Sequence, residues 1–149
     1  MLGSGWAPLC VADHRRLGAR GGKLFSLERV AHTGALPFEM KTMHLVKDGF
    51  EIEFTKSVGE SKRQFQPGDA SVEQFHYHYW ATYGSPEIDR AALKVTEGTY
   101  RADGKVLKIT VPGLVPDRIC EIRLRNFVSS DGEALVHPEC WYTLNQLQE

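Results

Sequence analysis

The run Asp103-Gly-Lys-Val-Leu-Lys-Ile-Thr-Val-Pro-Gly-Leu114 decides the fold of this chain. Between an Asp-Gly turn and a Pro-Gly turn, apolar residues alternate with polar ones, which is the pattern of a short antiparallel strand. The same alternating pattern continues in Ile119-Cys-Glu-Ile-Arg-Leu124 and Cys140-Trp-Tyr-Thr-Leu-Asn145. Short alternating strands separated by tight turns predict a small antiparallel β-sandwich, a kind of module that usually binds, spaces or packs and seldom catalyses.

Outward from this run, the alternation predicts about seven strands in one sandwich of the immunoglobulin or fibronectin III type, so the fold class is all-β. The expected strands are 38–46, 50–55, 71–80, 93–101, 105–111, 118–127 and 134–144. Residues 57–70 are polar and rich in turn formers, which predicts a loop. Ser85 before Pro86 has the pattern of a helix N-terminus and predicts one short helical turn.

The first part of the chain differs in composition from the rest. It is rich in Gly and Arg and has one plausible strand over 23–30. It ends at Thr33-Gly34, and the next segment begins at Pro37. We expect an irregular N-terminal arm over 1–36 and the sandwich domain over 37–149.

Composition narrows the function classes. The 149 residues carry a formal net charge of -1, which offers no electrostatic case for nucleic acid or for an anionic membrane. No apolar run approaches the ~20 residues of a membrane span. The stretch 1–12 is too broken by Gly and Pro for a signal peptide, so the compartment stays open, as does the alternative that the chain is a piece of a longer protein.

The three cysteines, Cys10, Cys120 and Cys140, are an odd count without metal-type spacing, which excludes a zinc ribbon and covalent haem. Alternation places Cys120 on the buried face of its strand. A hairpin between the last two strands would set Cys140 opposite a residue near Arg123 rather than opposite Cys120. We therefore expect buried free thiols rather than a disulfide.

The sharpest candidate for chemistry is the stretch 75–80, Phe-His-Tyr-His-Tyr-Trp. On a strand, His76 and His78 point to one face and could offer two imidazoles to a metal. A site needs further ligands, for which His44 or His137 would have to come near in space. We favour the alternative of a half-buried strand whose imidazoles lie among aromatic side chains.

Three aromatic residues, Trp80, Tyr83 and Trp141, could stack on a sugar or on a neighbouring domain. For Trp80 and Tyr83 we favour the alternative that they fill the sandwich core. The chain offers neither a complete phosphate-binding loop nor a Gly-x-Ser-x-Gly elbow, so no catalytic and no cofactor-binding residue is predicted.

Charged residues alternate outward on two expected strands. If these strands are neighbours, Glu51 and Glu53 would form an exposed charge ladder with Arg123 and Arg125. This ladder is a better explanation of the two carboxylates than acid–base catalysis, which needs a cleft and unequal environments.

A series of short stretches carries a family resemblance. These are Gly22-Lys-Leu-Phe-Ser-Leu-Glu-Arg29, His32-Thr-Gly34, Pro37-Phe-Glu-Met40, Asp48-Gly-Phe-Glu-Ile-Glu-Phe-Thr55, Tyr83-Gly-Ser-Pro-Glu87, Val111-Pro-Gly-Leu114, Glu121-Ile-Arg-Leu124 and Tyr142-Thr-Leu-Asn145. Together they resemble the C-terminal region of large secreted planctomycete-type glucose/sorbosone dehydrogenase-like proteins, in which a β-propeller is often joined to a c-type cytochrome domain. The resemblance covers nearly all of 21–145, although members tend to have a tyrosine where this chain has Cys120.

The resemblance implies that 21–34 are the tail of a propeller blade and that 37–145 are an appended Ig-like sandwich in a secreted or periplasmic protein. Catalysis and electron transfer would lie in the propeller and the haem domain, so no catalytic residue and no cofactor is expected here. The first hypothesis is therefore a non-catalytic accessory module that packs against or spaces a dehydrogenase-type propeller. The alternative is a stand-alone carbohydrate-binding module, and a metalloenzyme built on His76 and His78 comes third.

Overall fold

The computed structural model describes residues 9–13, 25–29, 34–81 and 83–148. The chain divides into two compact units, Met1–Leu36 and Pro37–Glu149, and each is described by itself. In the first unit, β1 (Leu9–Asp13) pairs antiparallel with β2 (Phe25–Arg29). The strand expected over 23–30 corresponds to β2, whereas its partner β1 was not predicted.

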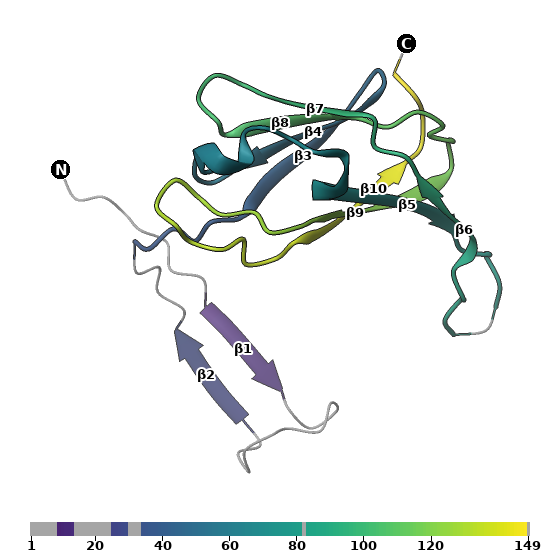
Figure 1. Cartoon of the computed structure of the whole chain (residues 1–149). Helices are drawn as coiled ribbons and strands as arrows, with labels where there is room; N and C mark the ends of the chain where they lie inside the picture. The colour runs from purple at the N-terminus through teal and green to yellow at the C-terminus, as the bar shows by residue number, and fades with distance from the viewer. Residues whose placement is uncertain (1–8, 14–24, 30–33, 82, 149) are drawn as a thin grey trace. The chain divides into compact units, whose positions relative to one another are not determined.

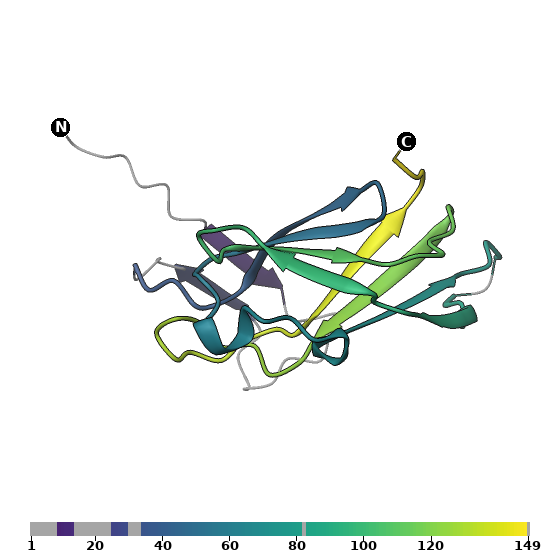
Figure 2. The same cartoon turned by 45° about the horizontal axis from the view of Figure 1, so that its top comes forward.

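The second unit is a β-sandwich of two four-stranded antiparallel sheets (Figures 1 and 2). Its strands are β3 (Met40–Val46), β4 (Gly49–Phe54), β5 (Ala70–His76), β6 (Ile88–Leu93), β7 (Glu97–Tyr100), β8 (Val106–Thr110), β9 (Arg118–Leu124) and β10 (Glu139–Leu144). One sheet has the order β3-β4-β8-β7 and the other β10-β9-β5-β6. The prediction of an all-β antiparallel sandwich is confirmed. The loop between β4 and β5 holds two single 3-10 turns, Glu60–Lys62 and Pro67–Asp69.

Sequence reasoning was wrong about the region that follows β5. The strand expected to reach residue 80 ends at His76, and the one expected over 93–101 is confined to β7. The strand β6 was not predicted, and it belongs to a different sheet from β7. The helical turn expected at Ser85 does not form. Gly84 has a φ of 79°, and the Ser85 hydroxyl accepts a hydrogen bond from the His78 amide at 3.2 Å instead of capping a helix. This sandwich unit therefore has eight strands rather than about seven.

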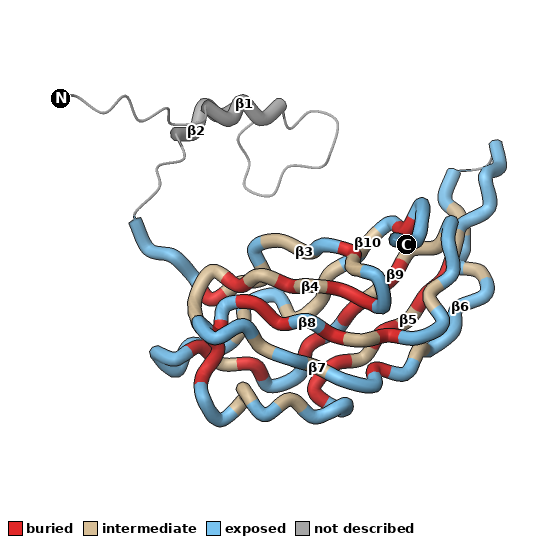
Figure 3. The backbone as a smooth tube through the Cα atoms, turned by 90° about the horizontal axis from the view of Figure 1, so that it is seen from above, coloured by how far each residue is buried: buried red, intermediate tan, exposed pale blue. Residues whose placement is uncertain are grey.

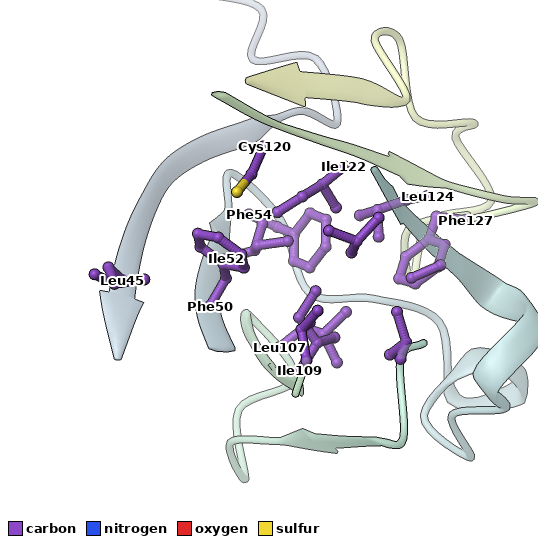
Figure 4. Close-up of a cluster of buried hydrophobic side chains, with 14 of the residues drawn as sticks. Leu45, Phe50, Ile52, Phe54, Leu107, Ile109, Cys120, Ile122, Leu124 and Phe127 are labelled. Carbon is purple, nitrogen blue, oxygen red and sulfur yellow. The ribbon is translucent and has the colours of Figure 1, made fainter. Parts of the chain in front are cut away.

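The core lies between the two sheets and follows the alternation of the strands. On β4, Phe50, Ile52 and Phe54 point inward and are buried, as expected from the sequence. They meet the inward residues of β9, which are Cys120, Ile122 and Leu124, and those of β8, which are Leu107 and Ile109 (Figure 4). Burying each large apolar side chain contributes about 1.5–3 kcal/mol. Figure 3 shows buried positions alternating with intermediate or exposed ones along these strands.

Aromatic rings and a few buried polar groups complete this interior. The ring of Phe54 lies 5.5 Å from that of Phe38 and 5.8 Å from that of Phe127. At the start of β5, the carboxylate of Asp69 accepts hydrogen bonds from Lys62 Nζ at 2.7 Å and from the Gln66 amide at 2.9 Å. Because this buried acid is paired and hydrogen-bonded, its burial costs little.

Cys120 is a buried free thiol, as expected, whereas Cys140 is a free thiol that is only partly buried. Cys120 pairs with Tyr142 and Cys140 with Ile122, so the two sulfurs are not opposite each other, and both residues are free thiols. Burial raises the pKa of Cys120 to about 11 and that of Cys140 to about 12. The side chain of Cys10 lies outside the described residues.

The charge ladder expected between Glu51, Glu53 and the arginines of β9 is wrong, because β4 and β9 belong to different sheets. Glu51 pairs instead with Arg101 at 3.1 Å, and Glu53 with Lys41 at 2.9 Å. The hydrogen bond from Lys41 lowers the pKa of Glu53. These two carboxylates therefore belong to ordinary exposed ion pairs within their own sheet.

The turn glycine before β4 is required by close packing rather than by its φ angle. At Gly49 a methyl group would overlap the carbonyl oxygen of Ile109 on the neighbouring strand β8, whereas at Gly68 it would meet nothing within 4 Å. We predict that Gly49→Ala lowers the free energy of unfolding by about 1–3 kcal/mol, the usual cost of overpacking. Gly68→Ala should leave it unchanged or raise it by about 0.4–1 kcal/mol. Urea denaturation of both variants measures this, and equal stabilities would contradict the close approach of β4 and β8.

The raised thiol pKa values predict that stability falls in alkaline solution. An unfolded cysteine ionises near pH 9, while the folded thiols stay protonated up to about pH 11 and about pH 12. Between these values the unfolded state binds fewer protons, so the free energy of unfolding decreases as pH rises. Urea midpoints measured from pH 7 to pH 10 should fall less steeply in Cys140→Ala than in the wild type. Identical slopes would show that Cys140 is not buried as a thiol.

Candidate functional site

The loop between β5 and β6 carries a group of exposed aromatic side chains. Tyr79 and Tyr83 are fully exposed, and Tyr77 and Trp80 are 46% and 48% exposed. Their burial in the core, which we had favoured from the sequence for Trp80 and Tyr83, is wrong. We call residues 77–87 the aromatic loop; it extends from the end of the sandwich where β5 stops (Figures 1 and 3).

Hydrogen bonds within the aromatic loop give it a defined shape. The indole Nε1 of Trp80 donates to the Gly84 carbonyl at 2.7 Å, and the His78 amide donates to Ser85 Oγ. Since these bonds hold Trp80 against the backbone of the loop, the orientation of its ring relative to the loop is fixed.

The base of the loop is a small polar cluster. Arg118 Nη1 donates to His76 Nδ1 and lies 3.5 Å from Asp89 Oδ2, which is also 3.6 Å from His76 Nδ1. Asp89 has a φ of 52°, a left-handed conformation that Asp tolerates better than most residues. The cluster ties the start of β6 to β5 and β9 at the point where the loop begins.

The histidines proposed as metal ligands come together only in part. The rings of His76 and His78 lie 5.5 Å apart, edge to face. His44 lies on β3 in the other sheet, and His137 Nδ1 is 3.0 Å from the carboxylate of Glu39. Within 34–81 and 83–148, no group of three or more His, Cys, Asp or Glu residues could hold a metal ion. The pair is therefore better explained as part of the loop's base.

Trp141 lies apart from the other two aromatic candidates. It is 57% exposed on the edge strand β10, opposite Glu121 of β9. Two strands, β9 and β5, separate it from β6 and the aromatic loop. The three residues proposed to contact a ligand thus form two surfaces, one at the loop with Trp80 and Tyr83 and one on the sheet with Trp141.

The outer face of the β10-β9-β5-β6 sheet holds a polar hollow of about 360 Å³ that the sequence did not reveal. Its lining residues are Ser71, Glu73, Arg90, Glu121, Arg123 and Arg125. They come from three strands and the residue after β9, and only the strand order brings them together. The outward alternation of Arg123 and Arg125 was visible in the sequence, but their partners on β5 and β6 were not.

Arg90 organises this face. Its guanidinium lies 4.6 Å from the centre of the Phe75 ring and forms ion pairs with Glu73, Glu87 and Glu121. Hydrogen bonds to these carboxylates, that to Glu87 foremost, raise the pKa of the guanidinium, which stays charged. Phe75 points away from the core and is nevertheless only 1% exposed, because Arg90 covers its face and Tyr77 its edge.

We predict that Arg90→Ala lowers the urea midpoint clearly, because it uncovers Phe75 and leaves three carboxylates facing one another without their shared cation. The matched control is Arg101→Ala, which removes an exposed guanidinium whose one ion pair among the described residues is with Glu51. Its midpoint should stay close to that of the wild type, as is usual for exposed ion pairs. Equal midpoints of the two variants would show that Arg90 is an ordinary surface residue.

The part of the chain that the structure describes contains no helix long and apolar enough to cross a membrane.

No family model and no curated protein matches the chain. Three solved structures of the bacterial surface-layer protein SbsC are similar in fold to this chain. The N-terminal part of SbsC matches with a TM-score of 0.55 at 15% identity, over 74% of this chain and 24% of that one. Domains 1–6 match with a TM-score of 0.54 at 16% identity, over 74% of this chain and 14% of that one. The chain thus spans only a small part of the length of these SbsC structures, and the likeness shows the fold alone.

Proposed function

We propose that this chain is a non-catalytic β-sandwich module that packs against or spaces another domain of a larger protein. The observation that carries the proposal is the aromatic loop, where Tyr79, Trp80 and Tyr83 are exposed next to one another on the chain. Exposed aromatic side chains are enriched at protein interfaces because they bury much area at little entropic cost. The fold likeness to a small part of SbsC, a structural surface-layer protein, supports a role as one module among several.

The neighbour that we propose is a dehydrogenase-type β-propeller. Its support is the set of short stretches in 21–145 that resemble the C-terminal region of propeller-containing sugar dehydrogenase-like proteins. In such a protein the sandwich would contribute contact area and distance, while oxidation of the sugar and electron transfer would take place in the propeller and its haem domain.

The module hypothesis predicts the size of the protein in its source cells. An antibody raised against residues 37–149 should detect a band well above the 16.8 kDa of this chain. Peptide sequencing of that band should then identify the adjoining domain. A propeller sequence would support the dehydrogenase partner, and a different domain would contradict it while leaving the module role. A single band at the mass of this chain would contradict the module role itself.

A second candidate is a carbohydrate-binding module that uses the aromatic loop. It is favoured by the hydrogen bond that fixes the Trp80 indole to Gly84, because a sugar ring stacks best on a ring that is already held in place. Tyr83 would offer a second exposed ring.

This candidate predicts that the chain is retained on insoluble cellulose or chitin, and that Trp80→Ala combined with Tyr83→Ala removes at least about 90% of the retained protein, as for loss of hot-spot residues. The control is Val136→Ala, which removes an apolar side chain of similar exposure from another part of the chain. Absence of retention, or equal losses in both variants, would contradict carbohydrate binding by the loop.

A further inference from the structure

The hollow on the outer face of the β10-β9-β5-β6 sheet has an ordered pattern of side chains that neither proposed function explains. The antiparallel registers place Trp141 opposite Glu121, and Glu121 opposite Glu73. Outward side chains that are directly opposite have Cβ atoms about 4.5–5.5 Å apart. The exposed indole of Trp141, which is not among the residues that line the hollow, therefore lies on the same face beside Glu121, with Glu73 one strand further on.

The other end of the hollow is basic. Arg123 follows Glu121 by two residues on β9 and lies opposite Ser71 of β5. Arg125 follows Arg123 by a further two residues and also lines the hollow. At about 3.3 Å per residue, the hollow extends roughly 13 Å along β9 from Glu121 to Arg125. One face thus presents, in order, an aromatic ring, carboxylates and guanidinium groups.

The charges of this face are not all neutralised by one another. Arg90 is shared by three carboxylates, and Arg123 lies 3.1 Å from Glu139 and 3.5 Å from Glu121. Arg125 is exposed and makes no ion pair within 34–81 and 83–148. Its guanidinium, next to the half-exposed Arg123, can donate hydrogen bonds to an anionic group without displacing an internal carboxylate.

These three kinds of group match one class of ligand. An exposed indole stacks on the apolar face of a sugar ring, carboxylates accept hydrogen bonds from its hydroxyl groups, and guanidinium groups bind a carboxylate bidentately. An apolar peptide would leave the charged lining unpaired, and a nucleic acid would meet too little positive charge. We propose that this face binds an acidic oligosaccharide, with one ring stacked on Trp141 and the carboxylate of a uronic acid held by Arg123 and Arg125.

This site borders the aromatic loop, since Glu87 of the loop forms an ion pair with Arg90 of the hollow. It uses neither Trp80 nor Tyr83, and it does not depend on the module role or on carbohydrate binding by the loop. At the basic end of the hollow, the binding free energy of the ligand should come largely from electrostatic attraction, and the affinity should fall as salt is added. At the aromatic end the stacking contact should be insensitive to salt, so a residual affinity should remain at high ionic strength.

Isothermal titration of the full chain with trigalacturonic acid tests the proposal, with the neutral trisaccharide maltotriose as the reference ligand. We expect the acidic sugar to bind at least about tenfold more tightly than the neutral one. Trp141→Ala and Arg125→Gln should each weaken its binding by about tenfold. The controls Arg101→Gln and Lys108→Gln, which each remove an exposed cation at the other sheet, should change it less than about twofold.

Absence of binding up to about 10 mM, equal affinity for maltotriose, or equal losses in the controls would each overturn the proposal. Amide chemical shifts of the wild-type chain provide a readout that needs no variant. On titration with trigalacturonic acid, the shifts should move at Ser71, Glu73, Glu121 and Arg123. Movement confined to the aromatic loop would contradict this site and would support the loop as the sugar-binding surface instead.

Discussion

Each sheet of this sandwich can bury only one of its faces, and the rest of the structure depends on that constraint. The inward rows of β4 and β9 meet between the sheets and set the distance at which the two layers pack. This contact keeps the thiols of Cys120 and Cys140 protonated, since an ionised sulfur in this interior would lose its hydration. Within one sheet, the pairing of β4 with β8 requires a glycine at Gly49, because a methyl group there would overlap the carbonyl oxygen of Ile109.

The same constraint leaves two outer faces whose residues are free of the core. On the outer face of the β10-β9-β5-β6 sheet, these positions are occupied by charged side chains that form ion pairs with one another. Arg90 combines two functions there, since it shields the outward ring of Phe75 from water and holds three carboxylates together. The face is therefore rigid around Arg90 and still has a spare cation at Arg125, which is the arrangement on which ligand binding at the hollow depends.

Two surfaces of different chemistry result, and they lie in different parts of the sheet. The aromatic loop presents flat, mostly uncharged rings on a segment held by a few hydrogen bonds and by the Arg118–Asp89 cluster at its base. The hollow presents charges on the rigid strands themselves. A module that contacts a neighbouring domain with its loop would leave the sheet face available for a small acidic ligand, so the two proposed roles are physically compatible.

By itself, the sequence determined the fold class, the inward residues of β4 and β9, and the absence of a bond between Cys120 and Cys140. These properties follow from the two-residue period of a strand and from local turns, which are written in consecutive residues. Tertiary structure alone decided which strands became neighbours. It separated Glu51 from Arg123, placed Trp141 away from Trp80, and gathered the hollow around Arg90. The physical reason is that pairing between strands depends on the closure of the whole sandwich, and no local pattern records the partner that a side chain meets across the sheet.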